Sequence, residues 1–248
     1  IMEIRKKDKL EGTEYEELEQ GKGSLMMQKV EKLHTFFSLI LNDISFRESD
    51  ILDEALVNTY ADFGINEDNN SLIDPLDDSK YKPMPILGDL KKRLDEYGSE
   101  ALRLQSVLTR YVTGSAKNFN MPTNVDLNNK FIVLDISALS KELLPIGMFI
   151  VLDYVWDKAR ENRREKKAIF IDEAWRLVGK GATPKASEFV TEIFKTIRGY
   201  GGAAIAATQD IEDVVSGDDE GGAKGIITNS KTKILMKADT SAIKVLSS

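Results

Sequence analysis

The chain has 248 residues, of which 42% are hydrophobic, with one histidine, no cysteine and a formal net charge of −7. This length is enough for one large or two modest domains, and the lack of cysteine excludes disulfide frameworks and cysteine-based zinc sites. A single histidine excludes metal centres built on a histidine pair, and the acidic balance argues against a surface that coats nucleic acid.

The first 120 residues are predicted to be mostly helical. The opening IMEI is typical of the end of a strand, and residues 5–23 form a charged stretch with little to bury. From Ser24, a candidate N-cap, apolar residues recur every three or four positions up to Leu41, which predicts a helix. Three more helices are expected, over residues 48–63, 86–97 and 100–112, with a polar loop over 66–85. We therefore expect a strand tail and connector over 1–23 and an all-α subdomain over 24–120.

The pattern changes after Pro122 to alternating strands and helices. Strands are expected over 131–136, 168–172, 203–208 and 233–237, and helices over 143–161 and 185–198. Continuous apolar strands joined through helices predict a parallel sheet that is covered on both faces, and ligands of such sheets bind beyond the carboxyl ends of the strands. The fold class expected for residues 121–248 is therefore α/β with a mostly parallel sheet.

Two adjacent acids end one of these strands, in the phrase KKAIFIDEAW. Asp172 is placed to hold Mg²⁺ through a water molecule, and Glu173 to orient or deprotonate the water that attacks a terminal phosphoryl group. The alternative is structural, because two acids at this point also favour the start of the following helix through its dipole. The buried strand AIFI in front of them favours the functional interpretation.

The next strand, AAIAATQD, ends in Thr208 and Gln209 at the same predicted edge of the sheet. A neutral polar side chain there is suited to contact the γ-phosphate or the attacking water, which is a sensor role. Thr208 and Gln209 can instead close the strand with local hydrogen bonds.

Arg198, in KTIRGYGG, lies at a helix end followed by a glycine-flanked turn. An arginine on such a loop can stabilise phosphoryl charge across a subunit boundary as an arginine finger, or it can simply complement the helix dipole. Arg176 is a second, weaker candidate for the same role. The basic run RENRREKK, residues 160–167, is interpreted as a solvated turn.

The segments FIVLDISALSKELLPIGMFIVLDYVWDKARENRREKKAIFIDEAWRLVG, FKTIRGYGGAAIAATQDIEDV and NSKTKILMKAD resemble one known family. They are similar to the C-terminal ATPase domain of the large cytoplasmic ATPase of type IV secretion and conjugative transfer systems. The resemblance covers most of residues 121–240, and the helical part fits the all-α appendage of that family. The IDEAW phrase and the Gly-Gly strand ending in Thr-Gln are its most specific elements.

The resemblance implies a RecA-like P-loop NTPase that forms hexamers, uses ATP and Mg²⁺, and energises pilus assembly or substrate transfer. It implies a cytoplasmic protein at the inner face of the membrane, with other secretion-channel subunits as partners. By motif position, Asp172 and Glu173 are the Walker B acids, Gln209 is the polar sensor with Thr208 beside it, and Arg198 is the finger.

The sequence departs from that family in one respect: it contains no GxxxxGK[ST] loop, the Walker A motif that cradles phosphates. In the family this loop precedes a strand like IMEI, so we expect the loop to lie upstream of Ile1. Without it, most of the binding free energy for ATP is missing, and we expect these 248 residues alone neither to bind nor to hydrolyse ATP.

Two other functions remain open at this level. A DNA-pumping translocase of the FtsK or HerA type shares the motor fold, but strong DNA binding is not expected from an acidic chain without a basic, aromatic-interleaved surface. A non-catalytic scaffold would keep the fold and dock partners through the helical subdomain.

Overall fold

The computed structural model describes residues 2, 4, 23–41, 43–123, 129–179, 182–208, 222–234 and 236. The chain divides into two compact units, Ile1–Val133 and Leu134–Ser248. The boundary predicted from the sequence, between residues 120 and 121, lies thirteen residues earlier.

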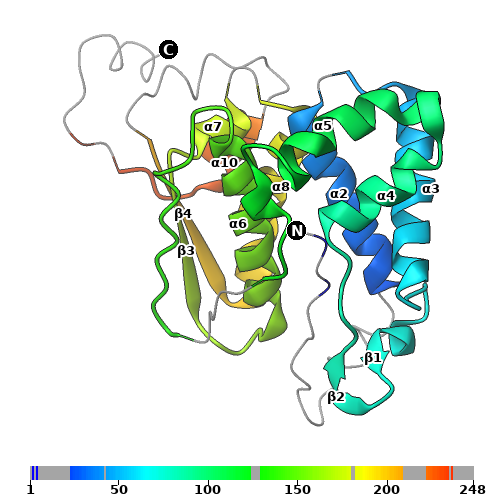
Figure 1. Cartoon of the computed structure of the whole chain (residues 1–248). Helices are drawn as coiled ribbons and strands as arrows, with labels where there is room; N and C mark the ends of the chain where they lie inside the picture. Colours follow the sequence, from blue (N-terminus) through cyan, green and yellow to red (C-terminus); the bar gives the residue numbers. More distant parts are fainter. Residues whose placement is uncertain are drawn as a thin grey trace. The chain divides into compact units, whose positions relative to one another are not determined.

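The first unit is built mainly from four helices: α2 (Leu25–Ile40), α3 (Phe46–Asp62), α4 (Leu87–Asp95) and α5 (Leu102–Val112) (Figure 1). Short 3₁₀ helices accompany them: η1 (Asn69–Leu72), η2 (Gly98–Ala101) and η3 (Lys117–Phe119). The Ser24 side chain accepts a hydrogen bond from the amide of Met27, so the predicted N-cap of α2 is confirmed. Gly64, two residues after the end of α3, has φ +67°, which is typical of a glycine that ends a helix.

The predicted apolar faces of these helices form the core of the first unit. Phe36 and Phe37 of α2 are fully buried, and the Phe36 ring lies edge-on to Phe37 and to Tyr111 of α5, with centroids 5.4 and 6.0 Å apart. Leucines of the other helices complete this core at no more than 1% exposure: Leu52, Leu56, Leu87, Leu90, Leu94, Leu104 and Leu108.

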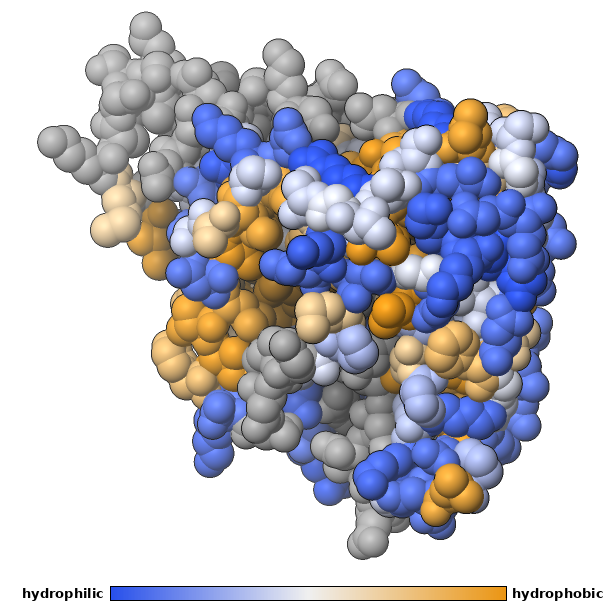
Figure 2. Space-filling view, viewed as in Figure 1, coloured by the Kyte–Doolittle hydropathy of each residue, from blue (hydrophilic) through white to orange (hydrophobic). Residues whose placement is uncertain are grey.

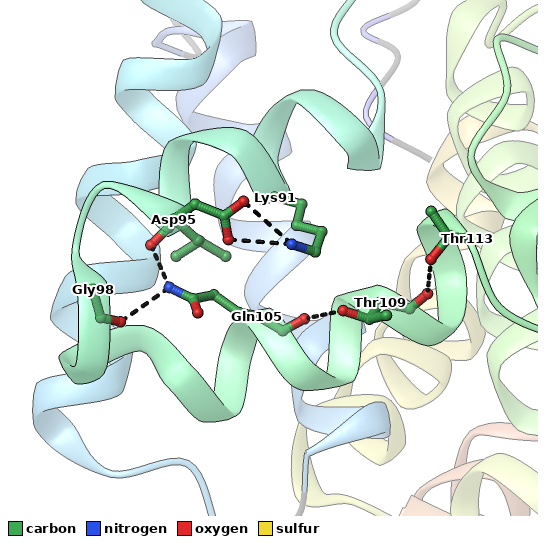
Figure 3. A network of polar contacts seen from close by, with 7 residues as sticks. Lys91, Asp95, Gly98, Gln105, Thr109 and Thr113 are labelled. Carbon is green, nitrogen blue, oxygen red and sulfur yellow. Dashed lines mark hydrogen bonds and ion pairs between the residues drawn. The ribbon is translucent and has the colours of Figure 1, made fainter.

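The turn between α4 and α5 is closed by one amide side chain (Figure 3). Gln105 donates through Nε2 to the carbonyl oxygens of Leu94, at 2.9 Å, and Gly98, at 3.0 Å. Both carbonyls lie at the end of α4 or just beyond it, where the regular hydrogen bonds of the α-helix stop. Gly98 has φ +57°, which a side chain would disfavour, so a glycine suits the turn that separates the two helices.

One feature of the first unit, a β-hairpin, was not predicted from the sequence, where residues 66–85 were expected to form only a polar loop. Strands β1 (Ile73–Asp74) and β2 (Asp77–Tyr81) form an antiparallel hairpin there. These short strands carry mostly charged and polar residues, so no alternation of apolar positions marks them. The turn is held by local chemistry instead: Asp74 Oδ1 accepts from the amide of Leu76 at 2.9 Å.

The second unit is a mixed α/β arrangement around two parallel strands, β3 (Lys167–Asp172) and β4 (Gly202–Ala207). Its helices are α6 (Leu144–Glu161), α7 (Trp175–Val178), α8 (Pro184–Thr196), η4 (Ile197–Tyr200) and α10 (Gly222–Asn229). Helices α6 and α8 lie to one side of the strand pair in Figure 1, and they contact each other through Phe149 and Phe189, whose centroids are 5.2 Å apart. The expected α/β class with a parallel sheet is therefore confirmed.

The other face of the strand pair is open among the described residues. Ile169 and Ile171 are buried, whereas Phe170 is 76% exposed and its register partner Ile205 is 38% exposed. In Figure 2, apolar surface appears over the region where Figure 1 draws β3 and β4.

The strands predicted over 131–136 and 233–237 were wrong for the residues that the structure describes there. Residues 131–136, and 233, 234 and 236 of the second segment, have no strand assignment. Several of their apolar side chains are exposed: Phe131, Val133, Ile234 and Met236. A short β-branched run predicts a strand only where a neighbouring strand supplies its hydrogen bonds, which is a tertiary condition that the local pattern does not contain.

Within the described residues, none of the helices combines the length and apolarity that crossing a bilayer requires.

Candidate functional site

Three of the five predicted site residues meet at the carboxyl edge of the parallel strands. In the β3–β4 register, Asp172 stands beside Ala207, so that Glu173 and Thr208 each follow one residue beyond this last pair. Asp172 and Thr208 are exposed, and Glu173 is half-buried. The parallel register thus places two carboxylates and a hydroxyl side by side where ligands of such sheets bind.

The backbone at Glu173 turns sharply out of β3. Glu173 has φ +53°, in the left-handed region that non-glycine residues seldom occupy. Its amide donates to Asp172 Oδ1 at 3.0 Å, and its carbonyl oxygen accepts from the amide of Arg176 at 3.1 Å. This turn connects β3 directly to α7 and fixes the two acids relative to each other. Strained backbone of this kind is concentrated at functional sites.

Sequence reasoning missed one residue of this turn, Trp175. Its indole Nε1 donates a hydrogen bond to Glu173 Oε2, and the guanidinium of Arg176 lies over its ring, 4.7 Å from the centroid. The available signal was the spacing, because a donor two residues after an acid at a strand end can fold back on that acid in a tight turn. Arg176, a predicted second candidate for a finger, contacts this ring in the structure.

Gln209, the predicted sensor, lies outside the described residues, so its role stays a prediction. Thr208, which precedes it, is the last described residue after β4.

Arg198 lies at the opposite edge of the strands. It is exposed in η4, which leads into the amino end of β4, whereas Asp172 ends the neighbouring β3. A six-residue strand spans roughly 17–20 Å. Within one chain, Arg198 and the acid pair are therefore too far apart to contact the same phosphoryl group.

The basic run 160–167 next to Arg198 is more than a solvated turn. Lys167 Nζ donates to the carbonyl oxygens of Ala159, at 2.7 Å, and Asn162, at the end of α6. The guanidinium of Arg163 lies over the Tyr200 ring, 4.6 Å from its centroid. A lysine and an arginine of the run thus tie α6 to the start of the strands, while Arg164 and Lys166 are exposed as expected.

The carboxyl edge fits a magnesium ion bound together with a phosphate ligand. No group of three or more candidate metal-ligating side chains occurs among the described residues, so a cage made of protein ligands alone is absent from that part of the chain. Mg²⁺ is usually held by one or two carboxylates, with water and substrate phosphates completing its shell. The exposed carboxylate of Asp172 supplies a hard oxygen ligand of that kind.

Comparison with known proteins gives consistent matches. Residues 70–245, well over half of the chain, match the family model described as the TraG P-loop domain. The chain is 30% identical over 164 residues to the protein TraC of Escherichia coli strain K12, which covers 65% of this chain and 18% of TraC. It is also similar to the solved structure of VirB4 of Thermoanaerobacter pseudethanolicus, with a TM-score of 0.78 and 27% identity.

The matches differ in how much of each relative they span. The VirB4 match covers 91% of this chain and 61% of the VirB4 chain, and the TraC match covers less than a fifth of TraC.

Proposed function

We propose that this chain, which belongs to the TraG P-loop domain family, is part of an ATP-hydrolysing motor that energises conjugative transfer or type IV secretion. The observation that carries the proposal is the pairing of β3 with β4, which brings Asp172 and Glu173 beside Thr208 at one edge of a parallel sheet. The similarity to TraC and VirB4 supports the same conclusion.

In this proposal Asp172 would hold Mg²⁺ through a bridging water molecule.

 The bound ion would neutralise charge on the β- and γ-phosphates and polarise the bond that breaks. Glu173 takes the proton of the attacking water as a general base, Thr208 lines the same edge, and Gln209 senses the γ-phosphate.

Arg198 is proposed to act on a neighbouring copy. Its position at the amino edge of β4 keeps it away from the acids of its own chain, while its exposed guanidinium is available to a nucleotide bound by another subunit. This arrangement supports a ring of identical subunits joined head to tail, and we propose a homo-hexamer. Its partners would be other secretion-channel subunits, at the cytoplasmic side of the inner membrane.

These 248 residues by themselves are proposed to be inactive, because they contain no GxxxxGK[ST] loop to bind the β- and γ-phosphates. Titration of the chain with labelled ATP and Mg²⁺ tests this statement. We expect no saturable binding, and micromolar affinity would overturn it.

The catalytic role is tested in a full-length protein that carries this chain together with a phosphate loop. Glu173→Gln should lower the ATPase turnover about 10²-fold or more, which is within the range for removal of a general base. Glu188→Gln, an exposed carboxylate of α8, is the matched control and should leave turnover unchanged. Unchanged turnover in Glu173→Gln would show that another residue is the general base. A wild-type protein without ATPase activity would favour the function of a non-catalytic scaffold.

A further inference from the structure

The side chain of Glu173 is held by a specific donor. Trp175 Nε1 donates to Oε2 of the carboxylate from the first position of α7, two residues further along the chain. An indole has a single N–H and no acceptor, and a carboxylate has two oxygens. The contact therefore occupies one oxygen of Glu173 and leaves Oε1 to accept a proton.

The tryptophan ring is itself held in place. The Arg176 guanidinium lies over it at 4.7 Å, and the neighbouring Leu177 and Val178 of α7 are buried. The hydrogen bond from the amide of Arg176 to the carbonyl oxygen of Glu173 closes the same turn. Because backbone and side-chain contacts both link these residues, the direction of the carboxylate depends on the position of the indole.

We propose that Trp175 is a positioning residue, which orients the Glu173 carboxylate toward the attacking water through its indole N–H. This inference rests on the proposed role of Glu173 as general base. A base must lie within hydrogen-bond reach of the proton that it removes, and a shift of about 1 Å can lower a rate roughly 10²-fold.

The hydrogen bond can be observed without any ATPase activity. The chain contains two tryptophans, Trp156 and Trp175, so ¹⁵N-labelling of the indoles gives two N–H signals, which the variant Trp156→Phe assigns. In Glu173→Ala, the Trp175 proton signal should move upfield and its exchange with solvent should accelerate, while the Trp156 signal stays in place. An unmoved Trp175 signal would overturn the inference.

The effect on catalysis is measured in the full-length protein. Trp175→Phe keeps an aromatic ring beneath Arg176 but removes the donor, so kcat should fall roughly 10- to 100-fold with KM for ATP unchanged. Trp175→His restores a ring N–H and should recover most of that loss. Trp156→Phe is the matched control. Trp156 also lies beneath an arginine, Arg160, whose guanidinium is 5.4 Å from the ring centroid, but it belongs to α6. The kcat of this variant should stay within about twofold of wild type.

A double-mutant cycle separates positioning from a general structural effect. In a Glu173→Gln background, adding Trp175→Phe should lower kcat no further, because the group that it positions is already gone. Equal losses from Trp175→Phe in both backgrounds would overturn the inference while leaving the role of Glu173 intact. Failure of the proposed function would appear separately, as unchanged turnover in Glu173→Gln alone.

Discussion

Glu48 shows how one side chain joins a helix start to a neighbouring helix. In the capping box of α3, the amide of Ser45 donates to Glu48 Oε2 at 2.9 Å, and the amide of Glu48 donates to Ser45 Oγ at 3.2 Å. Arg103 of α5 also donates to Glu48 Oε2, at 3.1 Å. The bonds from the Ser45 backbone and side chain, followed by Arg103, hold the pKa of Glu48 below its ordinary value of 4.5.

This shift predicts a pH dependence of stability. Because the pKa of Glu48 is lower in the folded state, its contribution to the unfolding free energy is present above about pH 4.5 and is lost as the pH falls through the folded-state pKa. Glu48→Gln should therefore destabilise the protein at pH 7 and lose most of that effect at pH 3. Urea unfolding at both pH values measures it, with the exposed Glu67→Gln as control. A Glu48→Gln effect equal at both pH values would contradict the prediction.

The serine of the same box has a separate expected effect. Ser45→Ala removes the side chain that caps α3, and the loss of such a cap costs about 1 kcal/mol. The midpoint of urea unfolding should fall accordingly, with the slope unchanged. A stability within a few tenths of a kcal/mol of wild type would mean that water replaces the hydroxyl.

Among the elements, the turn from η4 into β4 depends on a glycine. Gly201 has φ +74°, and a Cβ atom built there would lie 2.5 Å from the carbonyl oxygen of Arg163. That carbonyl belongs to the connection between α6 and β3, so the starts of β3 and β4 both lie next to this glycine. The close approach is between backbone atoms, which cannot move aside as a flexible side chain can.

Two alanine substitutions separate the cost of backbone strain from the cost of steric overlap between the new Cβ atom and its neighbours. Gly98→Ala, with φ +57° and no atom within 4 Å of the built Cβ, should lower the unfolding free energy by about 1 kcal/mol through the left-handed conformation alone. Gly201→Ala adds the overlap, and its loss should be larger by about 1–3 kcal/mol, as for overpacking. Denaturant unfolding followed by circular dichroism measures both, and equal losses would show that the connection before β3 relaxes.

The elements differ in how readily the sequence predicts them. Helix α2 was predicted because an apolar period and a side-chain cap, Ser24, both lie within one segment. Helix α3 was predicted from its apolar period alone, and its cap, Ser45, was not predicted. Strands β3 and β4 were predicted from short apolar runs, and the acid pair with Thr208 followed from the rule for parallel sheets. The contact of Trp175 with Glu173 was not predicted, because it depends on the left-handed φ of Glu173.

At the scale of the whole molecule, the two units differ in charge. Residues 1–133 contain 17 Lys and Arg against 24 Asp and Glu, whereas residues 134–248 contain 17 of each. The whole net charge of −7 therefore belongs to the helical unit, and the unit with the candidate site is balanced. The units also differ in their intrinsic fluorescence, because both tryptophans lie in the second unit.

The two units should respond separately to a core substitution. Leu52→Ala opens a cavity at a fully buried position of α3 and should cost about 2–5 kcal/mol within the first unit. Urea unfolding followed by circular dichroism should shift, while tryptophan fluorescence, which reports the second unit, should keep its midpoint. Leu76→Ala, at a position 94% exposed, is the control and should change neither signal. A shift of the fluorescence midpoint in Leu52→Ala would show that the units unfold together.

The placement of Asp172 and Arg198 at opposite ends of the strand pair has a kinetic consequence for the proposed motor. If each reaction centre takes its acids from one subunit and its arginine from the next, a dissociated subunit contains no complete reaction centre. Turnover per chain would then fall steeply on dilution, and adding an inactive Glu173→Gln protein with an intact Arg198 would restore part of the rate to a diluted Arg198→Ala protein.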